Sequence, residues 1–507
     1  MIAPCLMVQG TGSSVGKSVL ATALCRIFRR AGYRVAPFKA QNMALNASVA
    51  ADGGEIGRAQ AAQAEAAGIE PTVDMNPILL KPEPDGRSQV VVRGRAVARL
   101  PFREYGRLLP ELEPVVAESL ARLRAAHELV IMEGAGSPAE INLADRDLAN
   151  TRAARLGDAR VLLVGDVDRG GVFAALYGTL ALLRPEDRAR VGGFVVNKLR
   201  GDAALLDPGL DELEARTGVP VLGVVPWLAG VCVPAEDSLE LDDPARWGAP
   251  GGLEIAVLRL PHIANFDDFE ALAAEPGVRV RFVDAPPGLS NADLVVLPGS
   301  KSTAADLAWL AASGLGAAVR GAAAAGRPVL GVCGGYQMLG EAVRDPERVE
   351  SDVAAAPGLG LLPVVTTFAR DKTTVRVRAR VTAAAGVLAA ARGAAVRAYE
   401  IHAGLTRGHG AGAPFEIVER GGAATAAAEG ATSAAGNVAG TYLHGLFAND
   451  AVRGALLREL ARRRGRAPDP RWGAPRPDGY ERLADAVERA VDLPRVAKLA
   501  GLAFPKS

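Results

Sequence analysis

Cys333 is the residue whose surroundings most clearly indicate chemistry. An apolar run at 329–332 leads into it, the pattern Gly-x-Cys-x-Gly surrounds it, and a helical pattern follows. This is the layout of a nucleophile elbow, a sharp strand-to-helix turn that lifts a nucleophilic side chain above the edge of a sheet. The N-terminus of the following helix would favour the reactive thiolate. We therefore predict that Cys333 is a catalytic nucleophile, and that Cys5 and Cys25 are buried structural cysteines.

A thiolate nucleophile needs a base and hydrogen-bond donors that stabilise an oxyanion. His444 lies at the end of an expected strand far along the chain and is the predicted base, with His402 as the second candidate. Two backbone amides at the end of an earlier expected strand are the predicted oxyanion donors. The residues predicted to stabilise the oxyanion and bind the substrate of this site are Gly299, Ser300, Gly334 and Gln337.

A glycine-rich loop at 10–18 lies between an apolar strand-like segment and a helical pattern. Such a loop presents backbone N–H groups and a helix N-terminus to phosphate, with Lys17 reaching the terminal phosphates. Thr11 stands where the strict phosphate-binding pattern has its first glycine. The alternative, a glycine-rich turn before a helix, is disfavoured by the adjacent Gly-Lys-Ser. The predicted ATP-binding residues are Thr11, Gly12, Val15, Gly16, Lys17, Ser18, Lys39 and Asn197.

Two kinds of oxygen ligand for Mg²⁺ accompany this loop. The hydroxyl of Ser18 is one, and Glu133, at the end of the expected strand 129–133, is the other. Ligands bind at the carboxyl ends of parallel strands, and carboxylates suit Mg²⁺. Asp166 and Asp168 follow the next expected strand. They either hold metal or activated substrate, or they form the turn there, as aspartates often do.

The strands and helices expected to position these residues fall into two groups along the chain. Short β-branched runs alternate with amphipathic helical segments, which predicts an α/β fold with parallel sheets covered by helices. We predict a synthetase domain at 1–235, a linker at 236–252, a second α/β domain at 253–450 and closing helices at 451–507. The Ala/Gly-rich stretches 383–395 and 421–436 are predicted to be loops or tolerant surface insertions.

Composition restricts the possible partners. The 507 residues include 58 basic and 57 acidic ones, a net charge of +1, so no basic nucleic-acid surface is expected. No apolar run is long enough to span a membrane, and no signal peptide precedes the glycine-rich loop. Four widely spaced cysteines form no paired metal motif. A reduced cytoplasmic protein is the expectation, and the sequence gives no oligomeric state.

Taken together, these motifs resemble the cobyric acid synthase family of cobalamin biosynthesis across nearly the whole chain. Their order and joint presence are specific, although no single one decides the matter. The segments that carry the resemblance are 8–18, 39–46, 75–82, 133–142, 166–173, 234–237, 298–301, 331–340, 399–402 and 440–447.

The resemblance implies both fold and reaction. The first domain would be P-loop NTPase-like and similar to dethiobiotin synthetase, and the second a flavodoxin-like class I glutamine amidotransferase. Cys333 would release ammonia from glutamine. The first domain would use ATP and Mg²⁺ to activate the b, d, e and g carboxylates of the corrinoid adenosylcobyrinic acid a,c-diamide for amidation. Activation is needed because ammonia does not attack a carboxylate until it is converted to an acyl phosphate.

One position departs from the wider amidotransferase pattern. Many class I glutaminases carry Glu two residues after the catalytic histidine, where this chain has Leu446. His444 is therefore expected either to be oriented by another group or to act in a dyad, and glutamine hydrolysis to be slow until the synthetase site is occupied. The rival interpretations are the related a,c-diamide synthase and a non-catalytic P-loop switch protein. Segments 41–46 and 75–82 favour the cobyric acid synthase family.

Overall fold

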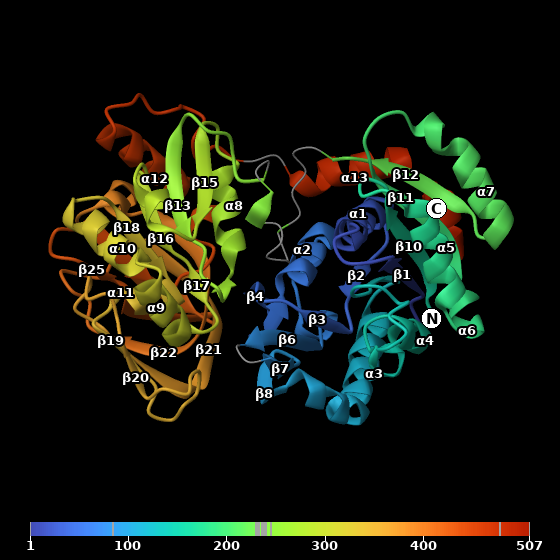
Figure 1. Ribbon diagram of the computed structural model, residues 1–507, viewed down its shortest axis with the longest axis horizontal. Helices are drawn as coiled ribbons and strands as arrows, with labels where there is room; N and C mark the ends of the chain where they lie inside the picture. The colour runs from blue at the N-terminus through green and yellow to red at the C-terminus, as the bar shows by residue number, and fades with distance from the viewer. Residues whose placement is uncertain are drawn as a thin grey trace.

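The protein is described by a computed structural model that covers residues 2–83, 86–228, 234, 241–243, 246–475 and 478–505. The chain forms two α/β halves that lie side by side, with the first half on the right of Figure 1 and the second on the left. Residues 236–240, 244 and 245 of the expected linker 236–252, and residues 235–237 of motif 234–237, lie outside the described residues. The predicted α/β fold class is confirmed.

The first half is built on a six-stranded parallel sheet whose strands are ordered β12-β11-β10-β1-β9-β2. Its strands are fully apolar in the middle because helices cover both faces. The strands are β1 (Cys5–Gly10), β2 (Val35–Phe38), β9 (Leu129–Glu133), β10 (Arg160–Asp166), β11 (Val191–Leu199) and β12 (Val221–Pro226).

Two apolar cores lie on the two faces of this sheet. One contains α1 and two helices from the end of the chain, and the other contains α3, α4, α5 and α7. The helices of this half are α1 (Lys17–Arg30), α2 (Arg58–Ala67), α3 (Leu109–Ala126), α4 (Thr151–Gly157), α5 (Val172–Leu182), α6 (Pro185–Arg188) and α7 (Asp207–Thr217). Helix α2 contributes alanines to both cores, which places it at the β2 edge of the sheet.

Between β2 and α3 the chain forms smaller sheets that face the second half (Figure 1). One has the order β3-β6-β7-β8, and the other is the hairpin β4–β5, which leads directly into α2. Their strands are β3 (Gln41–Met43), β4 (Ala47–Val49), β5 (Glu55–Gly57), β6 (Ile78–Glu83), β7 (Arg87–Val92) and β8 (Arg95–Pro101).

The second half has a central sheet of order β15-β13-β16-β18-β26-β25. Numbered within this half, its five parallel strands run 2-1-3-4-5, the flavodoxin-like order. The strands are β13 (Leu253–Leu258), β15 (Val278–Val283), β16 (Leu294–Leu297), β18 (Val329–Val332), β26 (Val438–Thr441) and the antiparallel edge strand β25 (Ala431–Thr432), with the small pair β14 (Ile263–Ala264) and β17 (Gly299–Ser300) beside them.

A second, mostly antiparallel sheet and four helices complete this half around one continuous apolar core. The sheet strands are β19 (Ala342–Arg344), β20 (Ala355–Pro357), β21 (Val365–Val381), β22 (Ala395–Arg407), β23 (Phe415–Arg420) and β24 (Ala423–Glu429). The helices are α8 (Glu270–Ala273), α9 (Thr303–Ala312), α10 (Leu315–Ala324) and α11 (Gly334–Leu339).

The prediction that 421–436 is a loop or surface insertion is wrong. Residues 423–429 form β24, and 431–432 form β25. Alanine and glycine have weak strand propensity, but the ladder with β23 supplies the backbone hydrogen bonds and fixes the conformation. Glu429, inside this stretch, is buried and accepts hydrogen bonds from the Thr441 hydroxyl (2.7 Å) and the Tyr442 amide (2.7 Å), beside the predicted site.

The closing helices divide between the two halves. Helix α12 (Asp450–Arg463) packs into the core of the second half, whereas α13 (Gly479–Ala490) and α14 (Leu493–Leu499) return to the first half and pack near α1. Among the described residues, no single helix is long and apolar enough to cross a membrane; α9 and α10 pass that test only together, with a bend of 83° between them.

Candidate active sites

Cys333 lies at a strained turn between β18 and α11. Its φ is +52° and its ψ −110°, a conformation that non-glycine residues rarely adopt and that recurs at functional sites. The neighbouring glycines let this turn approach the end of β16, because a Cβ on Gly335 would lie 2.0 Å from the Leu297 carbonyl oxygen. The expected elbow geometry is therefore present, and the thiol lies 3.5 Å from the carbonyl oxygen of Ile401.

His444 faces this thiol and has a carboxylate behind it. Its Nδ1 lies 2.7 Å from Oδ2 of Asp268, and Oδ1 of Asp268 accepts a hydrogen bond from the Gly445 amide (2.7 Å). The side chains of His444 and Asp268 are 2% and 5% exposed. A carboxylate on Nδ1 fixes the tautomer and directs Nε2 toward the nucleophile, as in a catalytic triad.

The electrostatics of the pair favour an imidazolium. Burial alone would lower the pKa of His444, but the negative charges of Asp268 and Cys333, with hydrogen bonds to both, raise it to about 10. The structure thus supplies the orienting group that the sequence left open at Leu446. Asp268 lies in η7 (Phe266–Phe269), 176 residues before the histidine. The only sequence signal was a pair of adjacent aspartates soon after a buried strand.

Gly299 and Ser300 border the elbow, as expected of oxyanion donors. A Cβ on Gly299 would lie 3.3 Å from Cε1 of His444, and a Cβ on Gly334 would lie 2.8 Å from the Ser300 amide nitrogen. The Ser300 hydroxyl donates to Asp306 (2.6 Å), which also contacts Nδ1 of His262 (2.8 Å). This buried carboxylate fixes the loop that carries the two predicted amides.

Gln337 and His402 occupy the far side of the site. The Gln337 amide accepts from Thr303 (3.0 Å) and donates to the Tyr442 hydroxyl (3.2 Å), so both of its ends have protein partners. His402 stacks on Tyr442 with ring centroids 3.8 Å apart, and burial lowers its pKa to about 4. A histidine held neutral and facing a carbonyl, Gly404 at 2.8 Å, is a poorer partner for a thiolate than His444.

The predicted phosphate loop lies between β1 and α1 in the first half. Lys17 is the first residue of α1, and its ammonium donates to the carbonyls of Gly12 (2.7 Å) and Gly136 (3.0 Å). The end of β11 supports the loop, because the Asn197 amide donates to the Val15 carbonyl (2.9 Å). Gly16, with φ +102°, has no room for a side chain there, since a Cβ would lie 2.0 Å from the Asn197 amide nitrogen.

Glu133 brings several of the predicted residues together. It is 1% exposed and accepts hydrogen bonds from the Ser18 hydroxyl (2.9 Å), the Lys39 ammonium (3.0 Å) and the Gln63 amide (2.5 Å). Burial would raise its pKa, but Lys39, Gln63 and Lys17 together lower it, so the carboxylate is ionised. Gln63 was not foreseen, because it lies inside a helix whose sequence indicates only packing.

This donor set fits Mg²⁺. One carboxylate and one hydroxyl, completed by phosphates and water, are the protein ligands that Mg²⁺ usually takes. Among the described residues no group of three or more His, Cys, Asp or Glu side chains forms an all-protein metal site. Asp166 instead pairs with Lys198 (2.8 Å) and accepts from the Asp168 amide (2.9 Å), the hydrogen bonding of a turn, and Asp168 pairs with Arg200 (2.7 Å).

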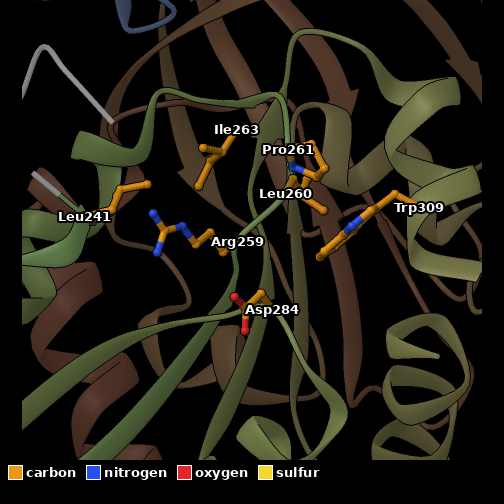
Figure 2. A pocket seen from close by; sticks show the side chains of 7 residues that line it. All are labelled: Leu241, Arg259, Leu260, Pro261, Ile263, Asp284 and Trp309. Carbon is orange, nitrogen blue, oxygen red and sulfur yellow. The ribbon is translucent and has the colours of Figure 1, made fainter. Parts of the chain in front are cut away.

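Two cavities lie away from the residues of both candidate active sites. One, of about 300 Å³, lies between Arg259, after β13, Asp284, after β15, and Trp309 of α9 (Figure 2). The other, of about 660 Å³, lies between Arg87 and Arg99 of the first half and α9 and α10 of the second. Neither cavity is lined by a predicted site residue.

Comparison with known proteins agrees with this arrangement. Residues 6–239 match the CobQ/CobB/MinD/ParA nucleotide binding domain, and residues 254–452 match the CobB/CobQ-like glutamine amidotransferase domain. The chain is 56% identical to "Cobyric acid synthase" of Sorangium cellulosum, with 99% of each chain covered. It is 52% identical to that of Pelotomaculum thermopropionicum, covering 100% of this chain and 98% of the relative, and 50% identical to that of Moorella thermoacetica, covering 99% and 98%.

Proposed function

The chain belongs to the cobyric acid synthase family, and on that premise we propose how its two sites divide one reaction. The enzyme is an amidoligase of cobalamin biosynthesis with a glutamine amidotransferase domain. The second half, from about 253, releases ammonia from glutamine. The first half, with α13 and α14 packed on it, binds ATP and activates carboxylates of the corrinoid.

In the second half, the Cys333 thiolate attacks the side-chain carbonyl carbon of glutamine. A C–S bond forms, and the oxyanion faces the amides of the Gly299–Ser300 loop. His444, held by Asp268 and charged at neutral pH, gives its proton to the leaving nitrogen as the C–N bond breaks, which releases ammonia. The neutral imidazole then takes a proton from water, which attacks the thioester and releases glutamate with a free thiol.

In the first half, a corrinoid carboxylate attacks the terminal phosphorus of ATP. An acyl phosphate forms and ADP leaves; ammonia then attacks the acyl carbon and expels phosphate, leaving the amide. Lys17 and the amides at the start of α1 bind the phosphates and stabilise the charge that develops on them. Mg²⁺, held by Ser18 and Glu133, would neutralise phosphate charge, and Lys39 fixes the Glu133 carboxylate.

The observation that carries the proposal is the Cys333–His444–Asp268 arrangement, buried at an elbow in the same chain as the Lys17 phosphate loop. The family match decides against the two rival interpretations, the a,c-diamide synthase and the non-catalytic switch protein. Identities of 48–56% to proteins named cobyric acid synthase, over at least 97% of this chain, favour the b, d, e and g carboxylates of the a,c-diamide as the substrates.

The test follows the corrinoid by mass. Incubation with MgATP, glutamine and adenosylcobyrinic acid a,c-diamide should convert carboxyl groups to amides in four successive steps. A Cys333→Ala variant should lose this conversion with glutamine and keep it with ammonia. A reaction that ends after a number of amidations other than four would indicate a different substrate. Loss of the ammonia-dependent reaction in Cys333→Ala would overturn the division of labour.

A further inference from the structure

Building on this proposed function, we propose that Arg58, in the synthetase half, is a positioning residue for the glutaminase triad. It holds the short segment 265–268, which carries Asp268, from across the boundary between the two halves. The reactive geometry at His444 then depends on a residue that belongs to the other reaction. The placement of α2 and β4 at this boundary is visible in Figure 1.

Segment 265–268 makes hydrogen bonds to the first half as well as to its own half. The Asn265 amide donates to the Ala47 carbonyl (2.6 Å), and the Phe266 backbone amide donates to the Asn46 side chain (3.3 Å). Asn265 has a positive φ of 53°, an uncommon conformation that these bonds help to hold. The loop that presents Asp268 therefore takes its shape partly from residues 46 and 47.

Arg58 adds an ion pair to this segment from the first half. Its Nε lies 2.9 Å from Oδ2 of Asp267, with side chains 18% and 8% exposed, and its guanidinium also contacts Glu65 (3.1 Å) on the same helix. Asp267 is buried beside two further carboxylates, Asp268 and Glu270. Burial and these charges raise the pKa of Asp267 to about 7 against the opposing effect of Arg58. Without the Arg58 guanidinium, the neighbouring carboxylates would repel one another or Asp267 would bind a proton. The side chain of Asp268 would then move from its position beside His444.

The Tyr399 side chain forms a second link between the first half and His444. The Tyr399 ring stacks on His444, with centroids 5.3 Å apart and planes at 20°, and the two backbones pair through two hydrogen bonds of 3.2 and 3.0 Å. The Tyr399 hydroxyl donates to the Ala47 carbonyl (3.2 Å) and accepts from the Asn265 amide (2.9 Å). Tyr399 and the segment that carries Asp268, through Asn265, thus both contact the first half at Ala47.

The middle of α2 reaches the synthetase site. Arg58 is the first residue of this helix, and Gln63, one and a half turns later, donates to Glu133 at 2.5 Å. A short, hydrogen-bonded helix keeps these two side chains at a fixed separation. Helix α2 therefore contacts both sites, with Arg58 at the segment that carries Asp268 and Gln63 at the carboxylate of the phosphate site.

The experiment compares Arg58→Ala and Arg58→Lys with a matched control, Arg376→Ala, in the full chain. Arg376 also crosses the boundary, but its partners there are Glu70 (2.5 Å) and the Val49 carbonyl (2.9 Å) and not segment 265–268. We expect Arg58→Ala to lower kcat for glutamine hydrolysis on the order of 10- to 100-fold, the usual effect of displacing a catalytic group slightly, with KM for glutamine nearly unchanged. Ammonia-dependent amidation should persist, and Arg58→Lys should recover most of the lost kcat.

Three outcomes would overturn the inference. They are an unchanged kcat in Arg58→Ala, an equal loss of glutamine-dependent and ammonia-dependent amidation, and an equal loss in Arg376→Ala. The last two would indicate a general role in joining the halves. Failure of the proposed function would appear in the wild-type chain, as absent glutamine hydrolysis or absent amidation, whereas failure of this inference appears only in the variants.

Discussion

Replacing Asp268 with asparagine tests the electrostatics of the triad most directly. The substitution keeps the size of the side chain and leaves an amide oxygen able to accept from Nδ1 of His444, but it removes the negative charge. The contact is 2.7 Å long and fully buried, so neither water nor salt replaces that charge. The change therefore separates the electrostatic role of Asp268 from its role in packing.

The size of the effect follows from the pKa of His444. Its rise from 6.5 to about 10 corresponds to roughly 5 kcal/mol in favour of the imidazolium, since one pKa unit is about 1.4 kcal/mol. The charge of Asp268 is the largest favourable cause, ahead of Cys333, and burial opposes both. Without it, burial should push the pKa down, so His444 would lose its proton at a lower pH. By analogy with the aspartate of a serine-protease triad, kcat should fall on the order of 10⁴-fold.

The assay measures glutamate release against pH for the wild type and Asp268→Asn. In the wild type the imidazolium persists until the pH rises through about 10, so the alkaline decline of kcat due to His444 should lie there. In the variant, kcat should be low throughout and its alkaline decline should begin at lower pH. Ammonia-dependent amidation serves as the control and should be unchanged. A variant with wild-type kcat and an unshifted alkaline decline would refute the assignment of Asp268 to the triad.

Two further predictions address the other half and the core. Glu133→Gln should abolish ADP release and amidation with either nitrogen donor, while glutamine hydrolysis persists. Amidation at the wild-type rate would contradict the assignment of Glu133 to the phosphate site. Arg453 is 1% exposed and paired with Glu275 (2.5 Å), so Arg453→Ala should lower the free energy of unfolding, measured by denaturant titration, by about 3–5 kcal/mol. Arg462→Ala is the control and should show no measurable change, because the Arg462 side chain is 73% exposed in its pair with Glu459.

The sequence by itself determined the features that depend on short segments. The elbow at Cys333 and the phosphate loop at Lys17 each consist of a strand, a tight glycine-rich turn and a helix, so the residues that shape them are close together in the chain. The alternation of buried strands and helices likewise fixed the α/β class, because each element carries its own apolar pattern. The alanine-rich strand β24 was wrongly predicted as a loop, since its conformation comes from pairing with β23 and not from its own residues.

Only the tertiary structure decided which distant groups complete the sites. Asp268 meets His444 across 176 residues, Gln63 meets Glu133 across 70, and α13 and α14 return to the first half after the second is complete. Aspartates and glutamines in loops and helices have no local pattern that marks a catalytic partner. Their roles arise when folding buries opposite charges and hydrogen-bonding groups together at the edges of two sheets, and that pairing is a property of the packed molecule.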